Sequence, residues 1–358
     1  MNGLMKQEEK ALFSLRKLYQ RFGYSQFKMS KFEPYDLYMQ NKDFLVSDGV
    51  IAFTDTDGTL MALKPDVTLS IVKNYRKTAV PVQKVYYNEN VYRIAGAGNT
   101  FREILQTGLE CMGDVGFYEI CEVILLAVES LKAISPKFML DISHMLIVWE
   151  ILSDLSLSFE EQAFVLESIR DKNEDALGAY PAVQKLIRTS GSISCILPEL
   201  EPMCSTAASK QALEQLQIIE RMLQAHGLAE YVNIDFSIVN DMNYYNGIVF
   251  RGYVEGIPVG VLSGGEYDKL MEKMGKTTKG IGFAVYLDQL ERLDTHGRSY
   301  DVDTVILYSE NDDPAALTKA AEQISSDGKS VLLLQQLPEN LRYANLMKYD
   351  NGSVKTVG

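Results

Sequence analysis

Polar and small residues alternate along one segment that has the composition of a β-strand. Gln106, Gly108 and Glu110 fall on every second position, with Leu105 and Leu109 among the residues between them. Because successive side chains of a strand point to opposite faces, this spacing predicts a polar face backed by an apolar one. An amide and a carboxylate on either side of a glycine would form a floor with room for a ligand above it. A solvated sheet face shows the same alternation, so the pattern alone leaves both interpretations open.

A second candidate for chemistry is a short acidic run that follows an apolar segment. Asp55 and Asp57 resemble the nucleophile loop of haloacid-dehalogenase-like phosphatases, in which paired aspartates attack and protonate a phosphate. Such a loop leads into a helix, whereas residues 60–63 have the pattern of a returning strand. Asp57 and Gly58 also suit a tight hairpin turn, because both tolerate a positive φ. We favour the structural turn and keep the phosphatase as an alternative.

Two other segments fail as phosphate-binding motifs. Residues 275–277 read Gly-Lys-Thr, like the end of a P-loop, but Leu270 stands where that motif requires glycine. In a dinucleotide-binding loop that begins at Gly96, Phe101 would take the place of the last glycine. Neither segment predicts a nucleotide site.

The elements that would position these residues follow from periodicity and turn residues. Helical spacing predicts helices over residues 8–22 and 118–133, and an almost continuous helical insertion over about 143–228. The predicted strands cover residues 50–54, 59–63, 82–93, 102–112, 232–239, 245–254 and 258–262. The strands after the insertion should rejoin the sheet begun by the first half.

The end of the chain has a different pattern. Strand, helix and strand signals at residues 304–308, 314–324 and 330–334 predict a short α/β module over residues 301–358.

The composition argues against several kinds of protein. A chain of 358 residues with 46% hydrophobic content can build one large core and a smaller domain. Its net charge of -13 disfavours a nucleic-acid partner, because such partners reward positive charge. No apolar stretch approaches the roughly 20 residues of a membrane-spanning helix. Residues 1–10 do not resemble a secretory signal, so we expect a cytoplasmic protein.

Metal and cofactor chemistry has little support in the sequence. The four cysteines show no Cys-x-x-Cys spacing, and only three histidines are present. We therefore expect no metal site and no cofactor, and we interpret the cysteines as buried free thiols. They are Cys111, Cys121, Cys195 and Cys204.

Six short motifs, taken in order, resemble the histidyl-tRNA synthetase family over about residues 5–295. The motifs are Lys64-Pro65-Asp66-Val67-Thr68, Tyr92-Arg93, residues 102–110, Tyr244-Tyr245, Gly264-Gly265-Glu266-Tyr267-Asp268 and Gly282-Phe283-Ala284. Each is weak alone, and their ordered combination is specific. The resemblance implies an α+β core over residues 1–300 with a class II aminoacyl-tRNA synthetase-like fold, an antiparallel sheet flanked by helices, usually dimeric. Residues 301–358 would then be a truncated counterpart of the anticodon-binding domain.

The resemblance also implies a pocket for histidine. Asp66 would contact the amino group with support from Thr68, and Tyr245 and Tyr267 would close on the imidazole. Carboxylates compensate a cationic ligand, and aromatic walls with fixed acceptors discriminate a ring with two nitrogens. The implied histidine-binding residues are Asp66, Thr68, Arg93, Gln106, Glu110, Tyr244, Tyr245 and Tyr267.

The departures from the synthetase pattern affect catalysis. Asn240 stands where the family has an arginine beside the reacting carboxylate, and Gln289 aligns with an arginine that contacts ATP. The glutamate expected after Arg93 to hold adenine is also absent. Losing one such charge-stabilising donor typically costs on the order of a hundredfold to a thousandfold in rate. We therefore expect no catalytic residue, although Arg292 lies three positions after Gln289 and allows another alignment.

A histidine pocket without activation chemistry resembles the regulatory subunits of ATP phosphoribosyltransferase. The segment from residue 242 to 250 and the pair Pro65-Asp66 look like theirs. The resemblance implies a non-enzymatic protein, a homodimer within a hetero-oligomer that contains the short catalytic subunit of the first step of histidine biosynthesis. L-Histidine would be its ligand and feedback signal, with no tRNA bound. The alternative is a histidyl-tRNA synthetase, or a paralogue with residual activation chemistry, which Arg93 and Arg292 keep open.

Overall fold

The computed structural model describes residues 6–45, 49–95, 100–239, 245–293, 300–326, 328–350 and 352–357. The chain divides into two compact units, Met1–Leu293 and Asp294–Gly358. The predicted boundary at residue 300, and the relation of the second unit to an anticodon-binding domain, stay predictions. Among the described residues, no helix is long and apolar enough to cross a lipid bilayer.

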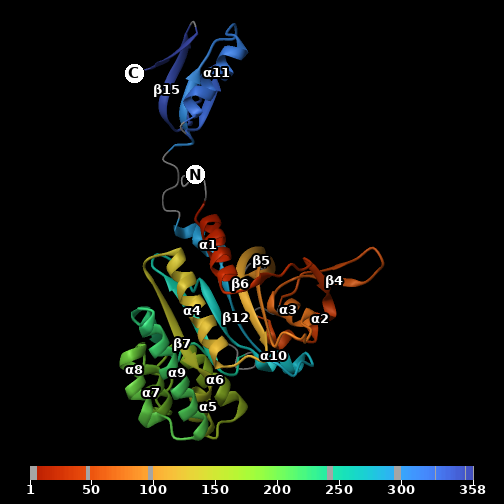
Figure 1. The fold of residues 1–358 in the computed structure, drawn as a ribbon, viewed down its shortest axis with the longest axis vertical. Coiled ribbons are helices and arrows are strands. Elements are labelled where there is room, and N and C mark those ends of the chain that lie inside the picture. Colours follow the sequence, from red (N-terminus) through yellow and green to blue (C-terminus); the bar gives the residue numbers. More distant parts are fainter. Residues whose placement is uncertain are drawn as a thin grey trace. The chain divides into compact units, whose positions relative to one another are not determined.

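A large sheet forms the centre of the first unit (Figure 1). Within the described residues its strands are, in spatial order, β1 (Ser25–Gln26), β5 (Val82–Ala95), β6 (Thr100–Gly113), β12 (Lys279–Tyr286), β11 (Leu262–Glu266), β10 (Ile248–Val254), β7 (Phe138–His144), β9 (Val232–Ile234) and β8 (Gly191–Ser192). Neighbouring strands are antiparallel except for β1 with β5 and β7 with β9, which are parallel. The predicted antiparallel sheet is thus mixed near its two edges.

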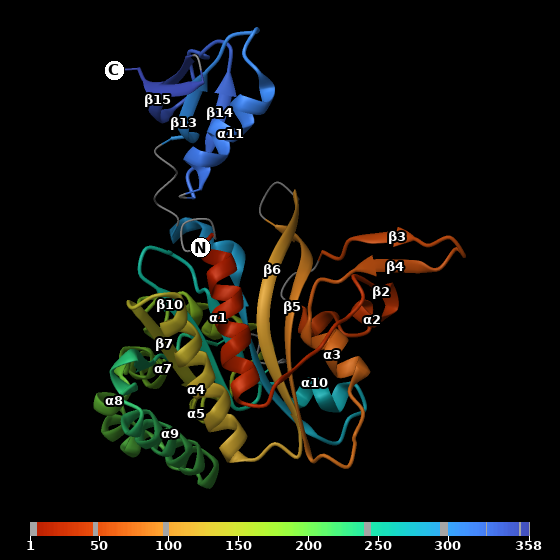
Figure 2. The ribbon, with the colours of Figure 1, turned by 45° about the horizontal axis from the view of Figure 1, so that its top comes forward.

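Two long helices, α1 (Gln7–Arg21) and α4 (Phe117–Ile134), cover one face of this sheet (Figure 2). Both were predicted, and both are confirmed within one residue at each end. α1 buries Ala11, Leu15 and Tyr19, which recur every four residues along one stripe of the helix. These side chains and the apolar face of the sheet belong to one continuous core.

The opposite face of the sheet carries a second, smaller core. Tyr86 of β5 packs into the core under α1 and α4, whereas its neighbour Tyr87 packs into the second core. This alternation is the period of two expected of a strand. The elements around the second core are α2 (Tyr35–Met39), α3 (Thr68–Asn74), α10 (Asp268–Lys273) and a small sheet in the order β2 (Phe32–Pro34), β4 (Leu60–Leu63), β3 (Ala52–Thr54).

The predicted hairpin at Asp57 and Gly58 is confirmed. Gly58 has a φ of 88°, and the Asp57 Oδ1 accepts a hydrogen bond of 2.9 Å from the Thr59 amide. The acidic run leads into β4 and not into the helix that a phosphatase loop of this kind requires. Both aspartates are exposed, and Asp55 accepts from the amide of Thr56. The phosphatase interpretation therefore has no structural support.

A helical insertion lies between β7 and β9. Its helices are α5 (Met145–Ser153), α6 (Phe159–Arg170), α7 (Pro181–Arg188), α8 (Ile193–Leu200) and α9 (Ala207–Ala225). The insertion was predicted from about residue 143, and its first helix begins at Met145. Ser143 and His144 end β7, a strand that the sequence analysis missed. Short 3₁₀ helices occupy Lys42–Phe44, Glu201–Met203, Ala229–Tyr231 and Leu287–Leu293.

Three predicted strands are shorter than expected or displaced. The strand predicted at 232–239 ends at Ile234, because Asp235 Oδ1 accepts from the Ser237 amide and turns the chain. The strand predicted at 245–254 begins only at Ile248. The strand predicted at 258–262 is wrong in position, since β11 begins at Leu262.

The second unit contains the predicted strand, helix and strand and two strands more. Within its described residues the order in the sheet is β14 (Val331–Leu334), β13 (Val302–Leu307), β15 (Tyr343–Asp350) and β16 (Ser353–Thr356), with α11 (Pro314–Ser325) packed on it. β13 is parallel to β14 and to β15, and β16 is antiparallel to β15.

The four cysteines are free thiols, but the interpretation of all four as buried is wrong. Cys111 and Cys204 are buried, Cys121 is half-buried and Cys195 is exposed on the surface of α8.

Candidate functional site

A pocket of about 410 Å³ lies on the face of the sheet opposite α1 and α4. Its lining residues are Phe44, Leu45, Asp66, Val67, Thr68, Tyr87, Arg93, Gln106, Glu110, Tyr245, Arg251, Gly260, Leu262, Ser263, Gly264, Tyr267, Gly282, Phe283, Ala284 and Tyr286. They come from several segments that are far apart in the sequence. The large sheet brings most of these segments together.

The structure brings seven of the eight predicted site residues to this one pocket. They are Asp66, Thr68, Arg93, Gln106, Glu110, Tyr245 and Tyr267. The eighth, Tyr244, lies outside the described residues, as does Asn240.

The floor of the pocket is built from the predicted polar face of β6 and the strand next to it. Glu110 pairs with Gly282 of β12, and Gln106 pairs with Tyr286. Behind this face, Leu109 packs into the core under α1, so the predicted alternation is confirmed. Gly282 leaves room that a side chain would remove: a Cβ there would lie 1.9 Å from Glu110 Oε2.

Glu110 is a buried carboxyl group with an altered ionisation. Only 2% of the residue is exposed, and its Oε1 accepts a hydrogen bond of 2.7 Å from the Thr68 hydroxyl. Burial raises the pKa of Glu110 to about 8, and the charge of Asp66 raises it further, against hydrogen bonds to Tyr267 and Thr68 that lower it. A large fraction of Glu110 is therefore protonated at neutral pH.

Asp66 brings a second carboxyl group from the start of α3. Its Oδ1 accepts a hydrogen bond of 2.8 Å from the Leu69 amide, one of the free donors at the beginning of a helix. Burial raises the pKa of Asp66, and this amide and the charge of Arg93 oppose the rise. Asp66 is thus a buried hydrogen-bond acceptor, and the Leu69 amide and the charge of Arg93 partly stabilise its anionic form.

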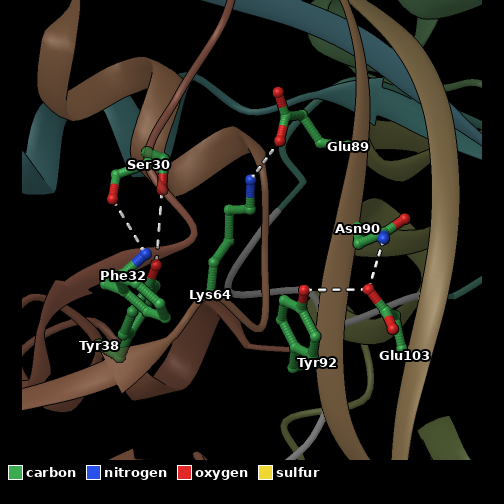
Figure 3. A network of polar contacts seen from close by, with 9 residues as sticks. Ser30, Phe32, Tyr38, Lys64, Glu89, Asn90, Tyr92 and Glu103 are labelled. Carbon is green, nitrogen blue, oxygen red and sulfur yellow. Dashed lines mark hydrogen bonds and ion pairs between the residues drawn. The ribbon is translucent and has the colours of Figure 1, made fainter.

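Polar contacts fix the segment that carries Asp66, and Figure 3 shows one of them, between Lys64 and Glu89. Lys64 is fully buried, and its Nζ lies 2.8 Å from Glu89 Oε2 on β5. The Tyr92 amide donates to the Lys64 carbonyl at 2.9 Å, and Arg93 Nε donates to the Pro65 carbonyl at 2.9 Å. The predicted motifs around Asp66 and Arg93 therefore also hold each other in place.

Gln106 offers a donor that the protein does not use. The residue is 2% exposed, and its Nε2 has no hydrogen-bond partner among the described residues. A buried donor without a partner costs free energy, which an acceptor on a ligand would recover.

Tyrosines form the walls of the pocket. They are Tyr87, Tyr245, Tyr267 and Tyr286. Burial raises the pKa of Tyr87, Tyr245 and Tyr286, so their hydroxyls stay protonated near neutral pH. The sequence analysis missed Tyr87, Tyr286 and Arg251. Tyr286 could have been found, because it continues the period of two from Gly282 and Ala284.

Gln289 is not part of this pocket. It lies in a second, more open cavity together with Arg102, Glu103 and Arg292, and its Nε2 donates to Asp288 Oδ2 at 2.8 Å. Arg102 and Arg292 therefore lie in the same cavity as Gln289, the residue that aligns with an arginine of the synthetase pattern.

The raised pKa of Glu110 predicts a pH-dependent stability. In the unfolded chain Glu110 loses its proton near pH 4.5, whereas in the folded protein it keeps it until about pH 8. Between these values the folded state binds more protons, so this group costs stability as pH rises, by up to about 1.4 kcal/mol per pH unit. We expect the free energy of unfolding of Glu110→Gln to fall less than that of the wild type between pH 5 and 8.

Urea denaturation of the ligand-free protein measures this difference. Glu255→Gln is the control, because Glu255 forms an exposed ion pair with Lys137. Parallel pH profiles of Glu110→Gln and the wild type would contradict the assigned ionisation.

The pocket combines groups that suit a small zwitterion with a ring. Asp66 and Glu110 supply acceptors for cationic or N–H groups, and Arg93 and Arg251 supply positive charge for an anionic group. The four tyrosines supply flat walls for the ring.

Comparisons with known proteins agree with this architecture. Residues 3–290 match the family model described as histidyl-tRNA synthetase. A curated ATP phosphoribosyltransferase regulatory subunit from Caldanaerobacter subterraneus subsp. tengcongensis is 30% identical over 290 residues, which cover 77% of this chain and 75% of that protein.

Two solved structures share the fold. One, from Bacillus halodurans, is titled as an ATP phosphoribosyltransferase regulatory subunit/histidyl-tRNA synthetase and has a TM-score of 0.75 at 23% identity, covering 96% of this chain and 93% of that one. The other is a chain of the ATP phosphoribosyl transferase (HisG:HisZ) complex from Thermotoga maritima, with a TM-score of 0.61 at 23% identity, covering 77% and 96%. The predicted α+β, class II synthetase-like fold is confirmed.

Proposed function

Since the chain belongs to the histidyl-tRNA synthetase family, and its curated relatives are regulatory subunits of ATP phosphoribosyltransferase, we propose that its pocket binds histidine and conveys feedback inhibition to a catalytic subunit. Its role in that enzyme is regulatory and non-catalytic. The Thermotoga maritima complex supports the short catalytic subunit as partner. We further propose a homodimer within the hetero-oligomer, in the cytoplasm, with no bound tRNA.

One observation carries the histidine assignment. Two buried carboxyl groups, an unused amide donor and tyrosine walls meet in one pocket of about 410 Å³. The ammonium and imidazole N–H groups of histidine match Asp66 and Glu110, and an acceptor of the ligand matches the Nε2 of Gln106. A ligand that lacked these groups would leave buried polar atoms unsatisfied, which is a strong basis for discrimination.

The loss of catalysis follows from the same comparison of residues. Activation of an amino acid by ATP depends on positive charge at the developing oxyanions. Gln289 offers an amide in place of a cation, and that amide donates to Asp288. The pocket therefore keeps the groups that suit a histidine ligand, whereas position 289 has lost its cation. Arg102 and Arg292 line the same cavity as Gln289, so the experiment must also test for residual activation.

Regulation requires a difference in affinity between two states. Histidine inhibits only if it binds the inhibited assembly more tightly than the active one, typically by about 1–3 kcal/mol, which is about 5-fold to 150-fold. By linkage, the catalytic subunit must change the affinity of this chain for histidine by the same factor.

The decisive experiment uses the chain co-purified with a short catalytic subunit. Formation of phosphoribosyl-ATP is measured with and without this chain, and with increasing histidine. We expect activity to require this chain and to fall as histidine rises, with heat of histidine binding in calorimetry of this chain alone. Absence of that heat at millimolar histidine would contradict the proposal. Histidine-dependent exchange of pyrophosphate into ATP would instead favour an active synthetase.

A further inference from the structure

Arg251 is a charged residue that lines the pocket and is not among the predicted histidine-binding residues. It lies on β10, pairs with Ser263 of β11 and Asp141 of β7, and lines the pocket from the side of β10. Its stem passes over Gly260, where a Cβ would lie 2.9 Å from the Cγ and Cδ atoms of Arg251. Gly260 also lines the pocket, so the aliphatic part of the Arg251 side chain lies beside a lining residue.

The register of the sheet places Arg251 across the pocket floor from β6. Ser263 pairs with Ala284 of β12, and Ala284 pairs with Gly108 of β6. Directly paired residues of antiparallel strands share a face, so this row runs under the pocket from Arg251 to Gly108. The three residues that follow Arg251 in this row, Ser263, Ala284 and Gly108, are all small. Three strand spacings, about 14 Å in all, separate the backbones of β10 and β6.

The two carboxyl groups of the pocket lie on one side of it. Asp66 and Glu110 lie on the side of α3 and β6, where Thr68 contacts Glu110 directly. Arg93, the other cation of the lining, lies on that same side and uses its Nε on the Pro65 carbonyl. The side of β10 has Arg251. A ligand with a cationic and an anionic end would therefore be oriented by this separation.

We propose that Arg251 is a specificity-determining residue that receives the carboxylate of the ligand. The assignment rests on the proposed function, because it takes an amino acid as the occupant of the pocket. Guanidinium is planar, always charged and matched to a carboxylate by paired N–H groups, so it suits this role better than lysine. Arg251 would thus supply, from β10, positive charge that the synthetase pattern places at position 240.

Asp141 is the charged residue that pairs with Arg251 on the neighbouring strand. It faces Arg251 on β7, accepts a hydrogen bond of 3.2 Å from Asn233, and lines a third cavity together with Arg251, Asp235 and Lys172. Burial and the charge of Asp235 raise the pKa of Asp141 to about 6, and Arg251 opposes the rise. The charges of Asp141 and Arg251 thus interact across the paired strands.

The test compares two ligands that differ in one group. L-Histidinol keeps the imidazole and the amino group of L-histidine but carries a hydroxymethyl group in place of the carboxylate. Calorimetry with the full-length chain measures both affinities for the wild type, Arg251→Gln and Arg251→Lys. Arg170→Gln is the matched control, because Arg170 lines the third cavity but not the pocket.

We expect Arg251→Gln to bind histidine about tenfold more weakly and histidinol within about twofold of the wild type. Arg251→Lys should keep part of the preference for histidine, and Arg170→Gln all of it. Equal losses for both ligands, or no loss, overturn the assignment of Arg251, since a purely structural pairing with Asp141 does not discriminate the ligands. A wild type that binds neither ligand overturns the proposed function itself, and this inference with it.

Discussion

Asp66→Asn is expected to lower the affinity for histidine by about a hundredfold and to remove feedback inhibition at the histidine concentrations that inhibit the wild type. Asparagine keeps an oxygen that can accept from the Leu69 amide, so α3 can still begin at Thr68. The change removes the negative charge that compensates the ammonium group of the ligand. Truncating one partner of a buried charged hydrogen bond typically costs about 2–5 kcal/mol, and a hundredfold corresponds to about 2.7 kcal/mol.

Calorimetry with histidine and the activity of the co-purified complex measure the two effects. The matched control is Asp313→Asn, because Asp313 Oδ1 accepts from the Ala315 amide at the start of α11, outside the pocket. The control should keep the affinity and the inhibition of the wild type. If Asp66→Asn binds histidine as tightly as Asp313→Asn, the amino group does not lie at Asp66.

Gly282→Ala is expected to lower the free energy of unfolding by about 1–3 kcal/mol and to abolish measurable histidine binding. The new methyl group would lie 1.9 Å from Glu110 Oε2 and 2.4 Å from the Leu109 carbonyl oxygen. The carboxyl group of Glu110 can rotate away, but the carbonyl belongs to the backbone of β6. The strands must therefore separate locally, and the displaced carboxyl group would occupy the space of the ligand.

Thermal and urea denaturation measure the loss of stability, and calorimetry measures the loss of binding. Gly178→Ala is the control, because a Cβ at Gly178 would have no neighbour closer than 3.5 Å. That variant should lie within about 0.5 kcal/mol of the wild type. Should Gly282→Ala bind histidine normally, the ligand does not rest on the floor formed by β6 and β12.

The parts of the fold that were predictable have strong local signals. The period of two at Gln106, Gly108 and Glu110 was sufficient to divide β6 into a polar face and a core face, but not to show that the polar face lines a pocket. The dipeptide at Asp57 and Gly58 was sufficient for the hairpin. In both cases the information lies within a few consecutive residues, where spacing decides the geometry.

The parts that were missed depend on distant segments. β7 directly precedes an apolar helix, and its last residues, Ser143 and His144, were assigned to the helical insertion. Nothing near them in the sequence shows that β10 and β9 lie on either side. Arg251 was missed for the same reason, because its position in the pocket depends on the pairing of β10 with β11 and β7. The grouping of the site residues came from the family resemblance, since their spacing along the chain does not predict that they meet.

The connectivity of the large sheet has a consequence for the newly synthesised chain. β6 pairs along one edge with β5, which precedes it directly, and along the other with β12, which follows the whole helical insertion. At about 5–20 residues per second, a ribosome needs roughly ten to thirty seconds to make the chain between these two strands. During that interval β6 presents an unpaired edge, which can pair with other chains. The helical insertion has mostly local contacts and can fold early, so it shortens the loop that β12 must close. Aggregation during synthesis is therefore most to be expected from nascent chains that end before residue 279.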